Sequence, residues 1–429
     1  MIMKKQESLK LRDEIDSLIR ARELKQAKSL IKSVSIKDIE PNERFYFASL
    51  ARRLQLNNLS LKFLWKNVTD NHITHQQDLK EYANSLRKAG LYSEALRILK
   101  RCPASGEFLL VKAFCYMSQW NYKEAYGLLQ LINIEELSES EQWVYKVNVA
   151  ACLVELKQYD EAKYIVDALF TAGIKSINYN LYLNCLELLG QIYFFKKDYL
   201  KAQGILRLAL DNIKSKIDHT YLFVEMWLLT SELALGHLRV HDSRLSIFKN
   251  KARVLGHWET LRHLDFNIAT LTNDNALFAK VYFGTPYEAF KQKVLEAGFH
   301  VHGNYIWQDG RRRFEEINIV DMYYPSVAQV ALGLTVHRLW LLMSSDFYRP
   351  WSATRIFDTL FPSENYNPFT SKKRVQQLIK KLREGLFEAG IEFELKSTKN
   401  GYRLRPLHLD SYKIYSLGFL PVTGPSLSP

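Results

Sequence analysis

The sequence predicts a mostly α-helical fold: a long repeat array of helix pairs, a solenoid, followed by a smaller domain of helices and short strands. Two observations predict it. A pattern of small and apolar residues returns at intervals of 30 to 40 residues, and after residue 298 the spacing of apolar residues changes from helical to alternating. The chain has 429 residues, 47% of them hydrophobic and 13% aromatic, which is enough to build a core for each part.

Each copy of the repeat has an aromatic residue or leucine, a small residue three positions later and two apolar residues three positions after that. A small residue there lets the partner helix approach closely. The middle positions are Ala27, Leu61, Ala95, Ala125, Ala162 and Ala202, which are 34, 34, 30, 37 and 40 residues apart, and Leu61 marks a copy without the small residue. The pattern resembles the tetratricopeptide-repeat family. That resemblance implies stacked helix pairs whose concave surface binds a peptide or protein partner.

Helical spacing predicts the other helix of each pair and further helices beyond the last copy. The predicted ranges are Asp78–Lys88, Glu107–Ser118, Glu141–Leu156, Leu181–Phe195, Tyr221–Gly236, Ser243–Leu255, His257–Thr270 and Asn275–Tyr282. Phe283-Gly284-Thr285-Pro286 then ends the array, because glycine and proline interrupt a helix. We therefore predict a repeat domain over 1–283 and a connecting helix within 284–298.

Alternating residues after the connecting helix predict a small sheet, with strands at Phe299–His302, Tyr305–Trp307 and Phe314–Ile319 and a turn at Gln308–Arg311. Two helices follow, Val327–Met343 and Trp351–Phe361, the second capped by Ser352 and stopped by Pro362. The predicted second domain covers 299–416, and 417–429 is predicted to be a flexible tail.

A basic amphipathic helix follows the loop Ser363–Pro368. Its apolar stripe is Val375, Ile379, Leu382 and Leu386, and a hairpin follows with strands at Ile391–Lys396 and Tyr402–Arg405. Between Thr370 and Arg405 the sequence has ten lysines and arginines against four glutamates, and all four glutamates lie in the second half of the helix or in the first strand. A helix with a cationic front followed by a basic hairpin is the outline of a winged helix-turn-helix.

The order sheet, three helices and hairpin resembles the DNA-binding domain of OmpR-type response regulators. The resemblance rests on Val375, Ile379, Leu382, Arg383 and Leu386 and on Gly401-Tyr402-Arg403-Leu404, which closes the hairpin. It departs from that family at Lys399-Asn400-Gly401, where the family usually has Gly-x-Gly, and it lacks a receiver domain. The resemblance implies double-stranded DNA as a partner.

Geometry suggests roles for most residues of the predicted DNA-binding surface. Side chains at the front of the helix would hold phosphates, Gln376, Gln377 and Lys380 would reach base edges, and the hairpin would contact the flanking backbone. The predicted residues are Ser371, Lys372, Lys373, Arg374, Gln376, Gln377, Lys380, Lys381, Arg383, Lys396, Lys399 and Arg403.

No motif of the sequence predicts an enzyme, a cofactor or a metal. Cys102, Cys115, Cys152 and Cys185 are widely spaced and read as buried thiols in a reducing compartment. Pairs of histidines occur without a third ligand, and phosphate-binding loops and catalytic signatures do not occur. The first residues have no apolar signal core and no window is long enough to span a membrane, so we expect a cytoplasmic protein.

We therefore interpret the chain as a transcription regulator whose repeat array senses or docks a peptide or protein and whose winged helix binds duplex DNA. A homodimer would let two winged helices meet two half-sites. The alternative is a non-enzymatic scaffold subunit of the PCI type, in which repeats and winged helix both bind protein. The ending, Leu407–Tyr415 and then Gly418-Phe419-Leu420-Pro421, and the basic helix disfavour that alternative.

Overall fold

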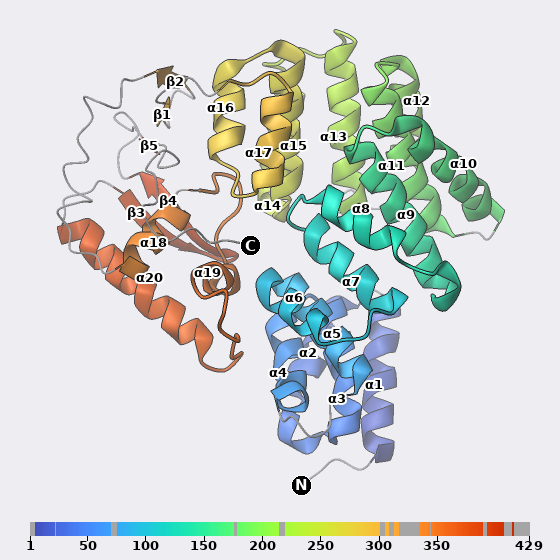
Figure 1. Ribbon diagram of the computed structural model, residues 1–429, viewed down its shortest axis with the longest axis vertical. Helices are drawn as coiled ribbons and strands as arrows, with labels where there is room; N and C mark the ends of the chain where they lie inside the picture. Colours follow the sequence, from blue (N-terminus) through green and yellow to red (C-terminus); the bar gives the residue numbers. More distant parts are fainter. Residues whose placement is uncertain are drawn as a thin grey trace. The chain divides into compact units, whose positions relative to one another are not determined.

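The chain is mostly α-helical in the residues that its computed structural model describes (Figure 1). These are residues 5–21, 23–69, 75–175, 178–213, 219–300, 305–308, 313–316, 334–343, 345–388, 393–406 and 414–415. Their contacts divide the chain into two compact units. Unit 1 comprises Met1–Tyr145 and Ser352–Gln377, and unit 2 comprises Lys146–Trp351 and Leu378–Pro429. The domain bounds predicted from the sequence concern independent folding and stay predictions.

The predicted repeat array forms, and consecutive helices pack against one another in pairs. In chain order the helices are α1 (Lys5–Arg20), α2 (Leu24–Ser33), α3 (Arg44–Arg53), α4 (Asn57–Thr69), α5 (Gln76–Ala89), α6 (Tyr92–Lys100), α7 (Gly106–Met117), α8 (Tyr122–Gln130), α9 (Glu139–Glu155), α10 (Tyr159–Lys175), α11 (Tyr179–Phe195) and α12 (Tyr199–Asn212). Short 3-10 turns lie at Ile36–Asp38, Pro41–Glu43 and Ile134–Glu136. First helices of successive pairs also touch, as α3 touches α5 and α11 touches α13 (His219–Ala234). This is the stacking expected of a tetratricopeptide-like array.

The small residue of the repeat does lie at the contact between paired helices. Ala27, Ala95, Ala125, Ala162 and Ala202 are completely buried. The second copy has its small residue too, one position earlier than we predicted: Ser60, fully buried, lies three residues into α4, as Ala95 does in α6. Our choice of Leu61 for this position was wrong by one residue. The Ser60 hydroxyl lies 2.7 Å from the Ala48 carbonyl and 2.6 Å from the Ser85 hydroxyl, so its polarity is satisfied inside the core.

In five consecutive helix pairs, α3–α4 through α11–α12, the turn inside the pair has a residue with left-handed backbone. Only one of these turns uses glycine, Gly90 with φ +83°, whereas the others use Gln55, Trp120, Lys157 and Lys197 with φ between 61° and 65°. In every case the small residue of the second helix comes five positions later, at Ser60, Ala95, Ala125, Ala162 and Ala202. The shared spacing shows that one turn geometry recurs through the array although its sequence varies.

The array continues through α13, α14 (Ser243–Leu255), α15 (Trp258–Thr272) and α16 (Asn275–Phe283) to the connecting helix α17 (Glu288–Glu296). Strands β1 (Tyr305–Gln308) and β2 (Arg313–Glu316) then form the predicted small sheet, antiparallel, with Tyr305 opposite Glu316. Strand β5 (Ile414–Tyr415), which we did not predict, joins it beside β1. Of the predicted strand Phe299–His302 only Phe299 and His300 are described, and they are not in a strand. The predicted turn beyond Gln308, residues 317–319 and the tail 417–429 lie outside the described residues.

The last helices are α18 (Leu334–Met343), α19 (Ala353–Leu360) and α20 (Ser371–Glu388). The remainder of the predicted helix Val327–Met343, residues 327–333, lies outside the described part of the chain. Ser352 caps α19 as predicted, because its hydroxyl accepts the Arg355 N–H at 3.2 Å. The predicted hairpin also forms, from β3 (Phe393–Thr398) and β4 (Gly401–Pro406), with Lys399-Asn400 as its turn.

A clear winged-helix domain is not seen, although the predicted order of its elements is. Helix α19 packs against α6 within unit 1, whereas α18 packs against β4 within unit 2. The boundary between the units falls inside α20, after Gln377. A winged helix needs its three helices around one core, and the described residues of α18, α19 and α20 are shared between two units instead.

Candidate nucleic-acid interface

Helix α20 buries the stripe that the sequence predicts and exposes most of its other side chains. Val375, Ile379, Leu382 and Leu386 are all buried. Because 3.6 residues make one turn, the side chains between them face solvent. Ser371 differs from its prediction as a DNA contact: it is buried, and its hydroxyl accepts the Asn367 N–H at 2.9 Å. It fixes the entry into the helix.

Six of the predicted residues form an exposed surface on α20, which we call the α20 face: Lys372, Lys373, Gln376, Gln377, Lys380 and Lys381. The side chains of five of them have no hydrogen-bond or ion-pair partner among the described residues. Lys380 lies 3.7 Å from Glu384 one turn further on, an exposed pair that contributes only about 0.3–0.5 kcal/mol. The α20 face is therefore a set of exposed polar and cationic side chains.

The three predicted arginines hold the protein together instead of facing solvent unpaired. Arg374 makes a two-pronged ion pair with Glu364, one of its contacts at 3.1 Å, and its guanidinium lies 3.7 Å from the centre of the Phe361 ring. Arg383 donates to the Leu395 carbonyl at 2.7 and 2.9 Å and thereby fastens β3 to α20. The forked donor geometry of arginine suits these contacts.

The hairpin places two lysines and the third arginine on its surface. Lys396 and Lys399 are exposed, and neither has a polar partner within the described ranges. Lys396 lies directly opposite Arg403, a cross-strand pair of like charge that weakens a sheet. Arg403 donates to the Phe347 carbonyl at 2.7 Å, which ties β4 to the segment before α19.

A second tie holds the hairpin at Trp351 and Tyr402. Each residue donates its N–H to the carbonyl of the other at 2.8 Å, so the two form an isolated antiparallel bridge. Trp351 is buried, whereas Tyr402 is half-buried. The hairpin thus has a fixed position within unit 2, with Lys399 at its tip.

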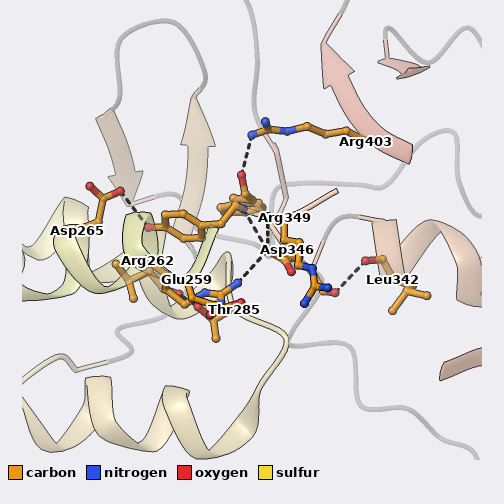
Figure 2. A network of polar contacts seen from close by, with 12 residues as sticks. Glu259, Arg262, Asp265, Thr285, Leu342, Asp346, Arg349 and Arg403 are labelled. Atoms are coloured by element: carbon orange, nitrogen blue, oxygen red, sulfur yellow. Dashed lines mark hydrogen bonds and ion pairs between the residues drawn. The ribbon is translucent and has the colours of Figure 1, made fainter. Parts of the chain in front are cut away.

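A buried network of ion pairs supports residues 346–349, the segment before α19, and the sequence alone did not predict this network (Figure 2). Arg262 on α15 donates to Asp346 at 3.0 Å and pairs with Glu259 one turn earlier, and both Arg262 and Asp346 have fully buried side chains. Burial lowers the pKa of Arg262, and the carboxylates of Glu259 and Asp346 raise it by a larger amount. The pKa of Arg262 therefore lies above its ordinary value. The charges are paired, which is a structural arrangement and not a reactive one.

The same network continues through Asp265, which pairs with Lys249 at 2.7 Å and Lys280 at 2.5 Å and accepts the Tyr348 hydroxyl at 3.1 Å. Burial raises the pKa of Asp265, but the two lysines more than reverse this and hold the pKa well below its ordinary range. Long-range contacts between α15 and residues 346–348 assemble the network, so no local sequence motif predicts it.

Among the described helices, none is both long enough and apolar enough to cross a bilayer.

Comparisons with known proteins identify no family for this chain. No protein-family model matches it, and no curated protein matches it in sequence. Among solved structures, it is similar to the crystal structure of the apo form of RapI, with a TM-score of 0.35 and 15% sequence identity over 64% of this chain and 85% of that one.

Proposed function

We propose that this chain is a non-enzymatic, DNA-binding regulator whose repeat array docks a peptide or protein partner and whose α20 face and hairpin contact duplex DNA. One observation carries the DNA part. The first turn of α20 has Lys372, Lys373 and Arg374 and no acidic residue. Cations at the positive end of a helix dipole cost stability, typically about 0.3–1 kcal/mol each when exposed. A phosphate at this end would reverse that cost.

The hairpin also supports DNA binding, because it too brings like charges together at a cost in stability. Lys396 opposite Arg403 disfavours the pairing of β3 with β4, yet the hairpin forms and keeps Lys399 exposed at its turn. An anionic ligand would neutralise this repulsion. Gln376, Gln377 and Lys380 have the donors and acceptors that read adenine and guanine edges in a major groove.

The array supports the other half of the proposal. Stacked helix pairs of this kind generally present a surface lined by their first helices, and such surfaces bind peptides and protein segments. A homodimer would bring two α20 faces to two half-sites, and a partner on the array would alter their spacing.

Fluorescence anisotropy with labelled duplex DNA tests the proposal. With about four phosphate contacts, the logarithm of affinity should fall with the logarithm of salt concentration at a slope of about −4, roughly 250-fold between 50 and 200 mM. Lys372→Ala with Lys373→Ala should lower affinity for all sequences and reduce the slope by about two. Lys10→Ala with Lys25→Ala removes the same charge from exposed positions of the first helix pair and should change neither the helix contacts nor the slope.

Sequence preference is tested by changing Gln376, Gln377 and Lys380 to alanine together. This should relax discrimination between selected and random duplexes, with about 1–3 kcal/mol lost for each good base contact, and Lys399→Ala should weaken all duplexes alike. If the triple variant kept its discrimination, α20 would not be the reading helix. If the folded wild-type chain bound no duplex at low salt, DNA binding itself would be wrong.

A scaffold role is the second candidate, and one observation favours it. Phe387 on α20 is 87% exposed, which is unusual for a phenylalanine and typical of a residue that a protein partner covers. Phe387→Ser tests this candidate. A scaffold subunit should lose its protein partner from co-purified assemblies and a DNA-binding regulator should keep its duplex affinity within about twofold.

A further inference from the structure

Helix α19 is anchored to the repeat array within unit 1. The Asp358 carboxylate accepts the backbone N–H groups of Ser93 and Glu94, at 3.1 and 3.3 Å, at the start of α6. An anion there satisfies free helix N–H groups and interacts favourably with the helix dipole. The Thr354 hydroxyl donates to the Ala89 carbonyl at 2.5 Å at the end of α5. Because of this anchor, the chain that follows α19 lies against the surface of α4 and α6.

The array then holds the backbone of that chain, residues 362–368, which we call the docked segment. The Arg97 guanidinium donates to the carbonyls of Pro362 and Glu364, the second at 2.6 Å. The Glu94 carboxylate accepts the Tyr366 N–H at 2.8 Å. Charged side chains of the array thus bind every second residue of the docked segment. They do so through backbone carbonyl and N–H groups, which every peptide has.

Two side chains of the docked segment are buried, Tyr366 and Pro368. The Tyr366 ring is 1% exposed and packs edge-on against Phe357 with ring centres 5.3 Å apart. Its hydroxyl donates to Asn58 at 3.3 Å, and Asn58 also donates to the Pro368 carbonyl at 3.5 Å. The Tyr82 hydroxyl beside this site is buried and has no hydrogen-bond partner in the described part of the chain. The site therefore fits a peptide with the sequence aromatic-x-Pro, in which x is any residue.

We propose that Asn58, Glu94 and Arg97 form a peptide-binding site that the chain fills with its own docked segment, and that a partner peptide with an aromatic-x-Pro sequence displaces it. The proposal rests on the proposed function in that the array docks a peptide. It adds where the peptide binds, what recognises it, and what already occupies the site.

Displacement would also reach the α20 face. Glu364 in the docked segment pairs with Arg374, and Phe361 just before it stacks on the same guanidinium. α20 begins at Ser371, three residues after Pro368. A peptide that removes the docked segment therefore frees Arg374 from Glu364 and adds a cation to the front of α20. Partner binding and DNA binding would then favour each other.

The covalent connection of the docked segment determines how the test must be done. A tethered ligand has an effective concentration on the order of millimolar, so a free peptide at micromolar concentration does not displace it from the wild-type chain. Tyr366→Ala in the full chain removes the main buried side chain of the docked segment and leaves Asn58, Glu94 and Arg97 intact. The site should then open to a peptide added in trans.

The experiment measures anisotropy of a labelled peptide with the sequence of residues 360–370, without DNA present. The Tyr366→Ala chain should bind it at least tenfold more tightly than the wild-type chain does. A peptide in which the tyrosine is alanine should not bind. Adding Arg97→Ala to the opened chain should weaken binding at least tenfold, whereas adding Arg101→Ala, an exposed arginine one turn further along the chain, should leave it within twofold.

Equal peptide affinity for wild-type and folded Tyr366→Ala chains would overturn the proposal, as would equal effects of Arg97→Ala and Arg101→Ala. If Tyr366→Ala does not fold, Asp358→Asn is the second variant. It removes the charge that binds the Ser93 and Glu94 N–H groups, which should open the site, and it leaves the side-chain volume nearly unchanged. On the wild-type chain, millimolar peptide should speed hydrogen exchange of the Tyr366 amide, and unchanged exchange counts against displacement. A chain that binds peptide but no duplex would overturn only the DNA proposal.

Discussion

Arg262 and Asp346 form an ion pair at 3.0 Å in which neither side chain has any solvent exposure. Asp346 also accepts the backbone N–H groups of Tyr348 and Arg349, at 3.1 and 2.9 Å, so the aspartate shapes the segment before α19 (Figure 2). Two buried charges cost several kcal/mol each to desolvate and are tolerated because they satisfy one another. The pair thus fixes residues 346–349 against α15 within unit 2.

Asp346→Ala should therefore be among the most destabilising single changes. It leaves the Arg262 charge buried, with Glu259 as its one remaining ion-pair partner among the described residues, which should cost about 3–5 kcal/mol of unfolding free energy. Denaturant unfolding followed by circular dichroism measures this. Asp167→Ala removes one side of the exposed pair between Lys163 and Asp167 and should cost less than about 1 kcal/mol.

Replacing both partners distinguishes burial of charge from loss of packing. Arg262→Met with Asp346→Leu removes both charges and keeps apolar volume, so it should be less destabilising than Asp346→Ala alone. If the double variant is the less stable one, the pair contributes through geometry that apolar residues do not replace.

A second prediction concerns Gly90, which lies where the array meets α19. Its φ is +83°, and a Cβ on it would come within 2.6 Å of the Arg355 Cγ. Gly90→Ala should therefore combine about 1 kcal/mol of backbone strain with displacement of α19. Gly236 has φ +74° and nothing within 4 Å of an added Cβ, so Gly236→Ala carries the strain alone.

Hydrogen exchange separates the two glycine variants. Gly90→Ala should speed exchange at Ser93 and Glu94, whose amides bind Asp358, whereas Gly236→Ala should leave those amides unchanged. Equal protection of the Ser93 and Glu94 amides in both variants would show that Arg355 moves aside without loosening α19.

The sequence was sufficient to predict the helix pairs because their signal is local. A small residue at a fixed position and apolar residues at helical spacing are the direct cause of close helix packing, so Ala95 and Ala162 could be recognised without a structure. The register of α4 was missed because Ser60 is polar and its neighbour Leu61 is apolar. A hydroxyl that bonds to the Ala48 carbonyl behaves as a small core residue, and a pattern of apolarity does not detect it.

The sequence was insufficient wherever a contact joins distant parts of the chain. Ile356 and Phe357 predict a buried face on α19, but the same pattern suits a winged-helix core and the surface of α6. The deciding contacts, such as Asp358 with the amides of Ser93 and Glu94, span more than 260 residues. Arg374, Arg383 and Arg403 read as DNA contacts for a related reason: a sequence shows their charge but not the protein groups that they bind.

A third prediction separates structure from DNA binding at Arg383. Arg383→Gln shortens the side chain and removes the donors to the Leu395 carbonyl and the Ser397 hydroxyl. It should lower protection of the β3 and β4 amides against hydrogen exchange. Any loss of duplex affinity should then disappear when the hairpin itself is inactivated by Lys396→Ala and Lys399→Ala. A full additional loss on that background would instead make Arg383 a direct DNA contact.

The last prediction concerns pH and the docked segment. Burial raises the pKa of Glu94 from its ordinary 4.5 to about 7, the Tyr366 N–H and Arg97 act in the opposite direction, and Asp358 raises it again. Burial raises the pKa of Tyr82, and the nearby Glu94 carboxylate raises it further. Since the folded chain binds the Glu94 proton more tightly than the unfolded chain does, the contribution of Glu94 to folding stability is complete below about pH 4.5 and is lost as pH rises to about 7.

The loss should amount to at most about 3 kcal/mol, since each pKa unit corresponds to about 1.4 kcal/mol. The thermal midpoint of the wild-type chain should therefore fall between pH 5 and pH 7.5 more steeply than that of Glu94→Gln, whose amide still accepts the Tyr366 N–H but does not ionise. Parallel curves for the two chains would contradict the assignment.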